Sequence, residues 1–362
     1  MVTRVGSVAF YLGSHKNDTE MVPGHPGLDN LEDVIVDFID AAQSRLVIAV
    51  QELESEAIAK AILRAEIERK VQVKIVLEAD YLASKSRPKS VDEAFDSKGP
   101  HEVNRLLAAA LLRGTAWVRS DFNPKIFHQK FMVRDREAVL TGSTNFTPTG
   151  VGTAKQGGNL NHILIVEDRA FAKVYEREFR EISNGDFGKN VASRNEEPDT
   201  LEVSGVRLKA CFAPDHNPEM EIMKQIDKAR ARIDFAIFTF AKSSGIDDSL
   251  AKSAFAGLPI RGVMDSLQGN QTWSAKETLQ DANIDLLRVS KKKGVINKLH
   301  HKLMTLDDKA MVIGSFNYTG PANLTNDENI VVVSGNAAAP MVKAARLEID
   351  RIRAVHGTPF SD

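Results

Sequence analysis

One five-point spacing occurs twice in this chain, and it constrains the fold more than any other feature of the sequence. In each copy a histidine is followed by a lysine two residues later, then by an aspartate, a Gly-Ser pair and an asparagine, at identical intervals. The first copy runs from His128 to Asn145 and the second from His300 to Asn317. A doubled pattern of this length is a much stronger signal than one short motif, and it predicts a chain of two related halves.

Each copy has the pattern of a β-hairpin. After each histidine, apolar and polar residues alternate with the period of a strand. Because residues i and i+2 of a strand point to the same side, His128 shares a face with Lys130, and His300 shares a face with Lys302. A tight turn at the aspartate of each motif then allows a second strand to return beside the first. The returning strand brings the Gly-Ser-x-Asn segment close to the histidine and lysine of its own copy.

The side chains gathered in this way suit an anionic tetrahedral centre such as a phosphate. Lysine supplies a positive charge, and each copy adds neutral hydrogen-bond donors from its serine and asparagine, Ser143, Asn145, Ser315 and Asn317. Histidine can act as a nucleophile or as an acid and base near neutral pH. No cluster of Asp, Glu or Cys at metal-ligand spacing lies near either motif, so the sequence predicts neither a metal site nor another cofactor.

Both segments match the HKD signature, H-x-K-x4-D-x6-G-S-x-N, of the phospholipase D superfamily. This superfamily includes phospholipases, phosphatidyl transferases, nucleases and tyrosyl-DNA phosphodiesterases. The segments GSTNFT and GSFNYTG…NDEN most resemble the Nuc-type endonuclease branch. The resemblance implies that the two halves pack as a pseudo-dimer and that their motifs form one shared site.

The flanking sequence extends the duplication. Strand patterns alternate with helix patterns in the same order in both halves, and a strand at 44–50, for example, is matched by one at 232–240. This alternation predicts an α/β fold with two similar lobes, each a mixed β-sheet flanked by helices on both faces. We expect the first lobe at 1–192 and the second at 201–362, joined by a charged, proline-containing linker at 193–200.

The resemblance also implies roles for the motif residues. His128 and His300 would face each other across a phosphodiester. One attacks phosphorus to form a phosphohistidine, and the other protonates the leaving oxygen and then activates water. The resemblance implies that four side chains hold the non-bridging phosphate oxygens. These are Lys130, Asn145, Lys302 and Asn317. The resemblance also implies that the two turn aspartates, Asp135 and Asp307, are structural.

One asymmetry between the halves predicts which histidine attacks. Aligning the strands that follow the motifs places Glu328 opposite Asn161. In two-motif relatives this position hydrogen-bonds the catalytic histidine of the other half, so Glu328 would hold His128 and Asn161 would hold His300. A carboxylate stabilises an imidazolium, whereas an amide leaves the ring more easily deprotonated. Our hypothesis is that His128 is the nucleophile and that His300 is the acid and base.

Basic residues precede both motifs. Upstream of the second motif are Lys291, Lys292, Lys293 and Lys298, and upstream of the first are Arg119 and Lys125. These cations either contact a phosphate backbone or form a solvated surface, and the sequence favours neither interpretation. The polar segment 81–100 is likewise either a substrate-shaping loop or a solvated surface loop. For the segment 147–158 we favour a solvated surface loop.

Composition limits the remaining choices. Of the 362 residues, 43% are hydrophobic and 27% are charged, as in globular proteins, and the formal net charge is −2. Any basic surface must therefore be local. The single cysteine permits no internal disulfide, and no apolar run has the length of a signal peptide core or a membrane span. We therefore expect a cytoplasmic protein.

The favoured function is a metal-independent nuclease whose partner is nucleic acid. One alternative is a phospholipase D or phosphatidyl transferase, which would favour an apolar interfacial loop or a membrane helix near the site. A second alternative is a catalytically inactive scaffold, against which both intact motifs argue. A homodimer or a separate partner protein stays open, because a pseudo-dimer already completes one site.

Overall fold

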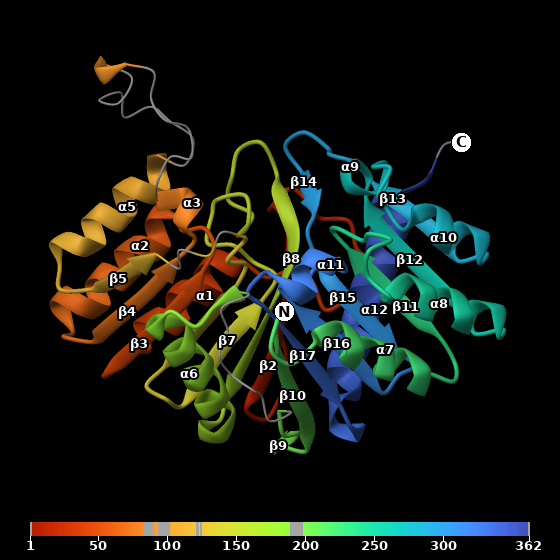
Figure 1. Ribbon diagram of the computed structural model, residues 1–362, viewed down its shortest axis with the longest axis horizontal. Helices are drawn as coiled ribbons and strands as arrows, with labels where there is room; N and C mark the ends of the chain where they lie inside the picture. Colours follow the sequence, from red (N-terminus) through yellow and green to blue (C-terminus); the bar gives the residue numbers. More distant parts are fainter. Residues whose placement is uncertain are drawn as a thin grey trace.

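The computed structural model describes residues 2–82, 90–92, 102–120, 123, 125–188 and 198–360. Within these residues the strands form two mixed sheets of nine strands each, which lie side by side in one molecule (Figure 1). The predicted α/β fold of two similar lobes is therefore confirmed. Most of the predicted linker, 193–197, and the basic middle of the segment 81–100 lie outside the described residues.

The first sheet has the order β1-β2-β8-β7-β6-β3-β4-β5, with β14 paired to β8. The strands at one end of the sheet, β3, β4 and β5, are parallel, whereas β6, β7, β8 and β2 pair antiparallel, which makes the sheet mixed. The strand bounds are β1 (Thr3–Val5), β2 (Val8–Gly13), β3 (Arg45–Val50), β4 (Gln72–Leu77), β5 (Trp117–Ser120), β6 (Lys130–Arg134), β7 (Ala138–Gly142), β8 (Gly158–Glu167) and β14 (Ile296–Leu299).

The second sheet has the matching order β18-β13-β12-β11-β15-β16-β17-β10-β9. Here β11, β12 and β13 are parallel, and β15, β16, β17 and β10 pair antiparallel. The strand bounds are β9 (Leu201–Val203), β10 (Val206–Ala213), β11 (Ile233–Ile237), β12 (Ile260–Asp265), β13 (Asp285–Val289), β15 (Lys302–Leu306), β16 (Ala310–Gly314), β17 (Glu328–Ser334) and β18 (Gly357–Pro359).

Helices cover both faces of each sheet. The outer face of the first sheet packs on α1 (Leu31–Asp40), α2 (Glu56–Leu63) and α5 (Glu102–Arg113), and that of the second on α7 (Pro218–Lys228), α8 (Ile246–Phe255) and α10 (Lys276–Asp281). The long helices α6 (Arg169–Asn184) and α12 (Ala339–Arg351) bury their apolar sides in one core that both sheets share. Short helices complete the chain, α3 (Ala79–Leu82), α9 (Ser266–Gly269) and α11 (Gly320–Leu324). Among the described helices, none combines the length and the apolar character that a membrane-spanning segment requires.

Several strands depart from the sequence prediction. The short edge strands β1, β9 and β18 have too few residues to show a period, and β2 and β10 were not predicted at all. The strand expected at 232–240 is shorter in the structure, where β11 ends at Ile237 and the amide of Phe238 makes one last hydrogen bond in register, to the carbonyl of His301. The strand β14 follows the predicted linker in sequence, yet it pairs in parallel with β8 of the first sheet.

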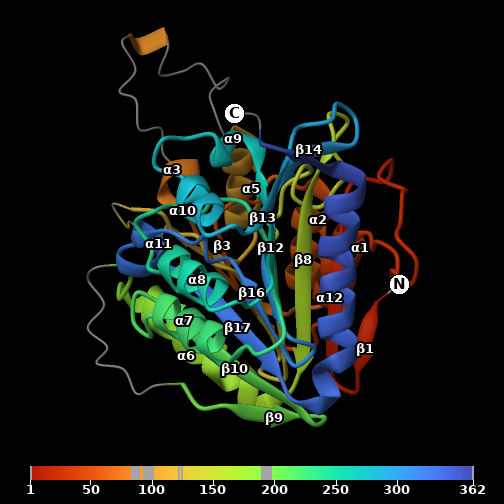
Figure 2. The same ribbon diagram turned by 90° about the vertical axis from the view of Figure 1, so that its right-hand side faces the viewer.

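A buried ionic network ties the N-terminal segment to α12, and Figure 2 shows this helix running alongside β1. The fully buried Arg351 donates to both carboxylate oxygens of Glu348, at 2.7 and 2.9 Å, and to Asp18 at 3.0 Å. Glu348 also lies 2.9 Å from Nε2 of His25 and 3.4 Å from Nε2 of His301. These contacts hold the segment before α1 against the second lobe.

The motif aspartates lie in the hairpin turns and point away from the strand ends that carry the histidines. Asp307 has a left-handed backbone (φ 54°), and its carboxylate accepts from the amides of Arg230, Ala231 and Arg232. Asp135 (φ 53°) holds the residues before β3 in the same way. Burial acts to raise the pKa of Asp307, but the amide hydrogen bonds outweigh it and hold the pKa below its ordinary value. The carboxylate therefore joins each hairpin to the start of the neighbouring strand.

Replacing Asp307 with alanine should lower the free energy of unfolding by about 3 kcal/mol, because three amides lose their acceptor and alanine strains a left-handed backbone. Asp307→Asn is the matched control, since asparagine tolerates this backbone and keeps one acceptor oxygen. Urea unfolding measures both variants. Because the folded pKa is depressed, the carboxylate's contribution is present above its unfolded pKa and is lost as pH falls through the folded pKa. Equal losses for the two variants would contradict this role.

Candidate active site

The two motifs meet in one pocket between the lobes. His128 and His300 both line a cavity of about 470 Å³, together with Asn145, Asn317 and Glu328. The pocket lies where β3 and β11 end, at the carboxyl edge of the parallel strands, which is where α/β sheets commonly bind ligands. The structure therefore brings the predicted catalytic side chains of both halves together.

The second ring nitrogen of each histidine is held by the opposite lobe. Nδ1 of His128 lies 2.6 Å from Oε2 of Glu328, and Nδ1 of His300 lies 2.9 Å from Oδ1 of Asn161. These are the two contacts expected from the strand alignment. Both contacts occupy Nδ1, so Nε2 of each ring is the nitrogen that remains for a substrate in the pocket.

The serines of the motifs, predicted as phosphate donors, instead direct their hydroxyls to other side chains, and neither is among the described residues that line the pocket. The hydroxyl of Ser315 donates to Oε2 of Glu328 at 2.8 Å, and that of Ser143 donates to Oδ1 of Asn161 at 2.8 Å. The amide orientation of Asn161 is set at its other end, where Nδ2 donates to the carbonyl of Gly150 at 2.9 Å. The serines therefore position the residues that position the histidines.

The motif lysines are buried beside their own histidines. Nζ of Lys130 donates to the carbonyl of His128 at 2.7 Å and to Gln51 at 3.2 Å, and Nζ of Lys302 donates to the carbonyl of His300 at 2.9 Å. Burial lowers the pKa of Lys130 to about 8. Burial and the charge of Lys130 lower the pKa of Lys302 well below its ordinary value. An anion in the pocket would stabilise both ammonium groups.

The histidines and Glu328 share the same buried environment. Burial, together with the charges of Lys130 and Lys302, lowers the pKa of His128 well below its ordinary value, and burial raises the pKa of Glu328 to about 8. The two rings behave alike, since burial and the two lysines also lower the pKa of His300. The His128–Glu328 pair therefore gives up its second proton near pH 8, after which Nδ1–H donates to the carboxylate and Nε2 has a free lone pair.

Three further pocket residues escaped the sequence analysis, and they make the two sides of the pocket chemically different. Glu52 follows β3, and its Oε1 accepts from Asn145 at 2.8 Å and from the hydroxyl of Tyr81 at 3.1 Å, while burial raises its pKa. Its neighbour Gln51 accepts from Lys130. At the matching end of β11, the ring of Phe238 lies 5.0 Å from that of His300. The only available sequence signal was their position directly after two aligned strands.

The predicted substrate contacts divide into two groups. Lys125 and Lys298 line the pocket, and Nζ of Lys298 lies 5.4 Å from the ring centroid of Phe238. Arg119 instead lies over the ring of Trp117 and donates to the carbonyl of Ser183, away from the pocket. The turn before β14 carries three exposed lysines, Lys291, Lys292 and Lys293. None of them is among the described residues that line the pocket.

One predicted surface loop contributes to the pocket. Thr147 and Thr149, at the start of the segment 147–158, line it, so the interpretation of this segment as a plain surface loop is wrong there. Phe127, directly before the first motif histidine, is fully buried in the core and offers no ring to a substrate. These outcomes depend on which residues the opposite lobe covers, and a local pattern does not carry that information.

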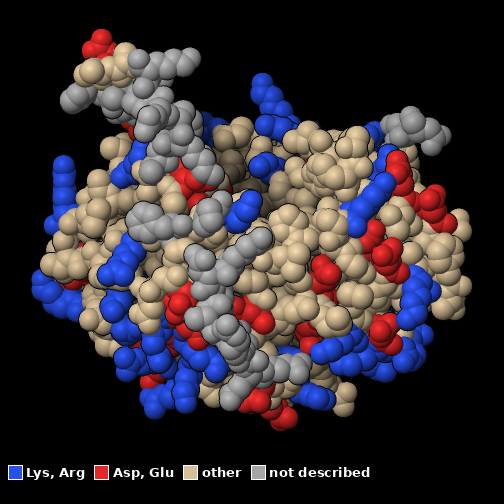
Figure 3. Space-filling model, in the orientation of Figure 1, with Lys and Arg blue, Asp and Glu red and all other residues tan. Residues whose placement is uncertain are grey.

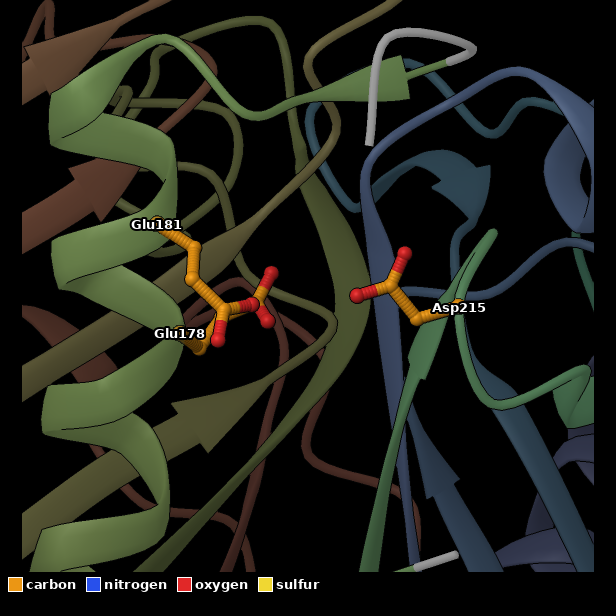
Figure 4. Close-up of side chains that lie close together, drawn as sticks. All are labelled: Glu178, Glu181 and Asp215. Carbon is orange, nitrogen blue, oxygen red and sulfur yellow. The ribbon is translucent and has the colours of Figure 1, made fainter. Parts of the chain in front are cut away.

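A separate acidic group lies between the lobes (Figure 4). Glu178 and Glu181 project from α6 towards Asp215, which follows β10, and the carboxylate oxygens lie within 4.8 Å of one another. Burial and the neighbouring carboxylates raise the pKa of Glu178 well above its ordinary value. One oxygen of Glu178 accepts from Gln129 at 3.3 Å. The sequence spacing did not reveal this group, because its members come from segments far apart in the chain.

Comparison with known proteins decides the family. The family model described as "Cardiolipin synthase, PLD-like domain" matches residues 35–183 and again residues 222–351. The chain belongs to the phospholipase D superfamily. The membership that the two motifs predicted is thus confirmed, and each half of this phospholipase D-like chain contains one match to the family model.

Individual relatives match less of the chain. "Phospholipase D" of Rickettsia conorii (strain ATCC VR-613 / Malish 7) is 30% identical over 143 residues, which is 38% of this chain and just under two thirds, 66%, of that protein. The phosphatidylserine synthase of Haemophilus influenzae Rd KW20 covers 99% of this chain and 88% of its own, with a TM-score of 0.67 and 13% identity, which shows a shared fold alone. Nuc from Salmonella typhimurium covers 43% of this chain and 99% of its own, at 21% identity and a TM-score of 0.38.

Proposed function

We propose that this phospholipase D-like chain is a metal-independent phosphodiesterase that hydrolyses nucleic-acid strands through a phosphohistidine. The observation that carries the proposal is the shared pocket, in which two imidazoles from different lobes present Nε2 while Nδ1 of each is held by the opposite lobe. Two such groups suit a reaction that needs a nucleophile and an acid on opposite sides of one phosphorus atom.

In the first step, Nε2 of His128 attacks phosphorus and forms a P–N bond while the P–O bond to the leaving group breaks. His300 donates a proton from its own Nε2 to the departing oxygen. It must enter this step as the imidazolium, and the negative charge of a bound phosphodiester would raise its pKa from the lowered value of the empty pocket. In the second step, His300 takes a proton from water, the water oxygen bonds to phosphorus, and the P–N bond breaks. The cycle ends with both rings in their starting states, so no other reactant is consumed.

The asymmetric partners support this assignment of roles. The Glu328 carboxylate at Nδ1 of His128 stabilises the positive charge that the ring gains on bonding to phosphorus. The amide of Asn161 supplies no charge, so His300 can gain and lose a proton within one turnover. Lys130, Lys302 and the two motif asparagines would hold the non-bridging oxygens.

The pocket lining favours a polar polyanion over a lipid. Among the described residues that line it, polar side chains predominate, and the apolar ones are Ile126, Phe238 and Pro321. Lys125 and Lys298 add positive charge from different lobes, as a phosphate backbone crossing the pocket requires. Phe238 offers a flat ring on which a base can stack.

A phospholipid substrate is the second candidate, and the names of the family model and of the Rickettsia relative favour it. Labelled single- and double-stranded DNA and RNA, and phosphatidylcholine or cardiolipin vesicles, should be incubated with the protein in EDTA. We expect cleavage of nucleic acid and no release of lipid headgroups. Headgroup release without strand cleavage would establish the phospholipid alternative, and inactivity on every substrate would favour the scaffold.

The pH dependence of hydrolysis tests the role of Glu328. Because its pKa is raised to about 8, kcat at saturating substrate should increase as pH rises towards 8, where the pair with His128 loses its second proton. It should fall again at higher pH, because the pKa of Lys130 is lowered to about 8 and its charge is lost. In Glu328→Gln the carboxamide does not titrate, so the acid limb should disappear. The alkaline limb should move to lower pH, because Lys130 loses the carboxylate charge that raises its pKa. An unchanged acid limb in this variant would contradict the assignment.

A further inference from the structure

The outward face of α6 carries a stripe of cations. Arg169, Lys173, Arg177 and Arg180 are all exposed, and their spacing of four, four and three residues places them along one side of the helix. The opposite side of α6 is buried in the core through Phe171, Tyr175 and Phe179, among others. The helix is therefore rigidly mounted, with its basic side turned towards solvent.

The stripe borders a hollow that is itself basic. A surface pocket of about 630 Å³ lies beside α6, and six of its lining residues are cations, Arg45, Lys74, Arg136, Arg169, Lys173 and Arg180. Its one acidic lining residue is Glu176, which is already paired with Arg45 at 3.2 Å. A second hollow that borders the helix is lined by three cations, Lys173, Arg177 and Arg180, and by one acidic residue, Asp199. In Figure 3 these basic side chains gather at the lower left, over α6 and the start of β3.

Part of this charge has no close counter-charge. Arg169 pairs with Glu137, but within the described part of the chain Lys173, Arg177 and Arg180 form no ion pair at salt-bridge distance. The charges of Arg177 and Arg180 act on Glu181 of the same helix, which compensates them only partly. The whole chain has a formal net charge of −2, so this face departs strongly from the average of the molecule. Holding like charges together costs free energy unless an anion binds, and this makes the surface a candidate binding site.

The basic face is separate from the catalytic pocket. Arg45 opens β3, and Gln51 and Glu52, which line the catalytic pocket, follow the other end of the same six-residue strand. A strand of this length spans roughly 20 Å. A ligand that contacts both sites must therefore be a polymer. Among the described residues, none lines both the basic hollow and the catalytic pocket.

We propose that the α6 face is a second binding surface for the phosphate backbone of the nucleic-acid substrate. The inference rests on the proposed function, and it adds an anchor that holds a long strand while one of its phosphodiesters occupies the catalytic pocket. Three of the four cations in the stripe are arginines, whose planar guanidinium groups match phosphate oxygens in pairs. A strand held at two places leaves more slowly than one held at the pocket alone.

An anionic membrane is the competing partner, and the surface suits it less well. Membrane-bound basic helices combine their charges with exposed apolar side chains that enter the lipid. The large exposed apolar residues of the described chain all lie outside α6 and the rim of its hollow. The face also has two hollows that border the helix, which fits a strand better than a flat bilayer.

The test compares two triple variants with equal loss of charge. The first replaces Lys173, Arg177 and Arg180 with glutamine, and the matched control replaces the exposed Lys228, Lys252 and Lys343, which lie on other helices. Binding of a long fluorescent single strand is measured against salt concentration in a His128→Ala background. The α6 variant should bind at least about tenfold more weakly, and the slope of log K against log salt should fall by about 2, while the control is unchanged.

Hydrolysis of a dinucleotide separates this inference from the proposed function. With His128 intact, the α6 variant should cleave a dinucleotide at the wild-type rate, because so short a substrate does not reach the basic face. Equal strand binding by the α6 variant and the control would overturn the inference. So would loss of binding to phosphatidylglycerol vesicles with strand binding retained, which would identify a membrane surface. If strands bind as expected but no dinucleotide is cleaved, the proposed function fails and the binding surface stands.

Discussion

Replacing His128 with alanine is expected to lower phosphodiester hydrolysis at least about 10³-fold and to abolish the covalent intermediate. The reason is that Nε2 of this ring is the proposed nucleophile, held in place by the 2.6 Å contact of Nδ1 with Glu328. Alanine removes the nitrogen that would bond to phosphorus. Rapid denaturation during turnover of a phosphorus-labelled substrate, followed by peptide mapping, should find label on His128 in the wild type and none in the variant.

The companion variant His300→Ala distinguishes the two rings. It should be equally inactive on a natural strand, because no other group is proposed to protonate the leaving oxygen. On a p-nitrophenyl phosphodiester, whose leaving group needs no proton, it should still release a burst of p-nitrophenol equal to the enzyme concentration and then stall at the phosphohistidine. His128→Ala should release no burst.

Two outcomes would contradict this assignment of the histidine roles. Label on His300 would exchange the roles of the histidines, and full activity in either single variant would exclude a shared site. Thermal unfolding of each variant is the necessary control, because both rings are largely buried and a folding defect would imitate a catalytic one.

Replacing Arg351 with methionine is expected to lower the free energy of unfolding by about 3–5 kcal/mol. The guanidinium is fully buried and donates to Glu348 and Asp18, so its removal leaves two carboxylates without their main counter-charge. Burial acts to raise the pKa of Glu348, but the charge of Arg351 holds it well below its ordinary value. Chemical denaturation measures the loss. Trypsin cleavage after Lys16 should also become faster, because Asp18 loses its ion pair with Arg351 and keeps only the weaker anchor of His356.

Lys343→Met is the matched control for this prediction. Lys343 lies on the same helix, α12, but its side chain is exposed, so the same substitution should change stability by no more than about 0.5 kcal/mol. If the two variants unfolded at the same denaturant concentration, the buried network would contribute little to holding the N-terminal segment on the second lobe.

The catalytic motifs were predictable because their geometry is local. A strand places residues i and i+2 on one face, so His128 with Lys130 and His300 with Lys302 follow from spacing alone. The hairpin after each pair is also a short-range structure, and both turns occur where the aspartates predicted them. The alternation of strands and helices likewise sufficed for the α/β class and for two similar lobes.

The contacts of Glu328 with His128 and of Asn161 with His300 had a different origin. No local rule relates residues about 140 or 200 positions apart, as these pairs are. Their expectation came from the resemblance to two-motif phospholipase D-like proteins together with the strand alignment. For the motif serines, by contrast, spacing alone predicts phosphate donors, because it does not reveal that Glu328 and Asn161 accept their hydrogen bonds.

By itself, then, the sequence determined the duplicated α/β architecture and the identity of the imidazole, ammonium and amide groups, since strand periodicity and motif spacing act over a few residues. Only the tertiary structure decided that Glu52 and Phe238 line the pocket, that Arg119 does not, and that α6 turns a basic face to solvent. Those features depend on which segments the opposite lobe or the shared core covers, and burial is a property of the whole packed chain.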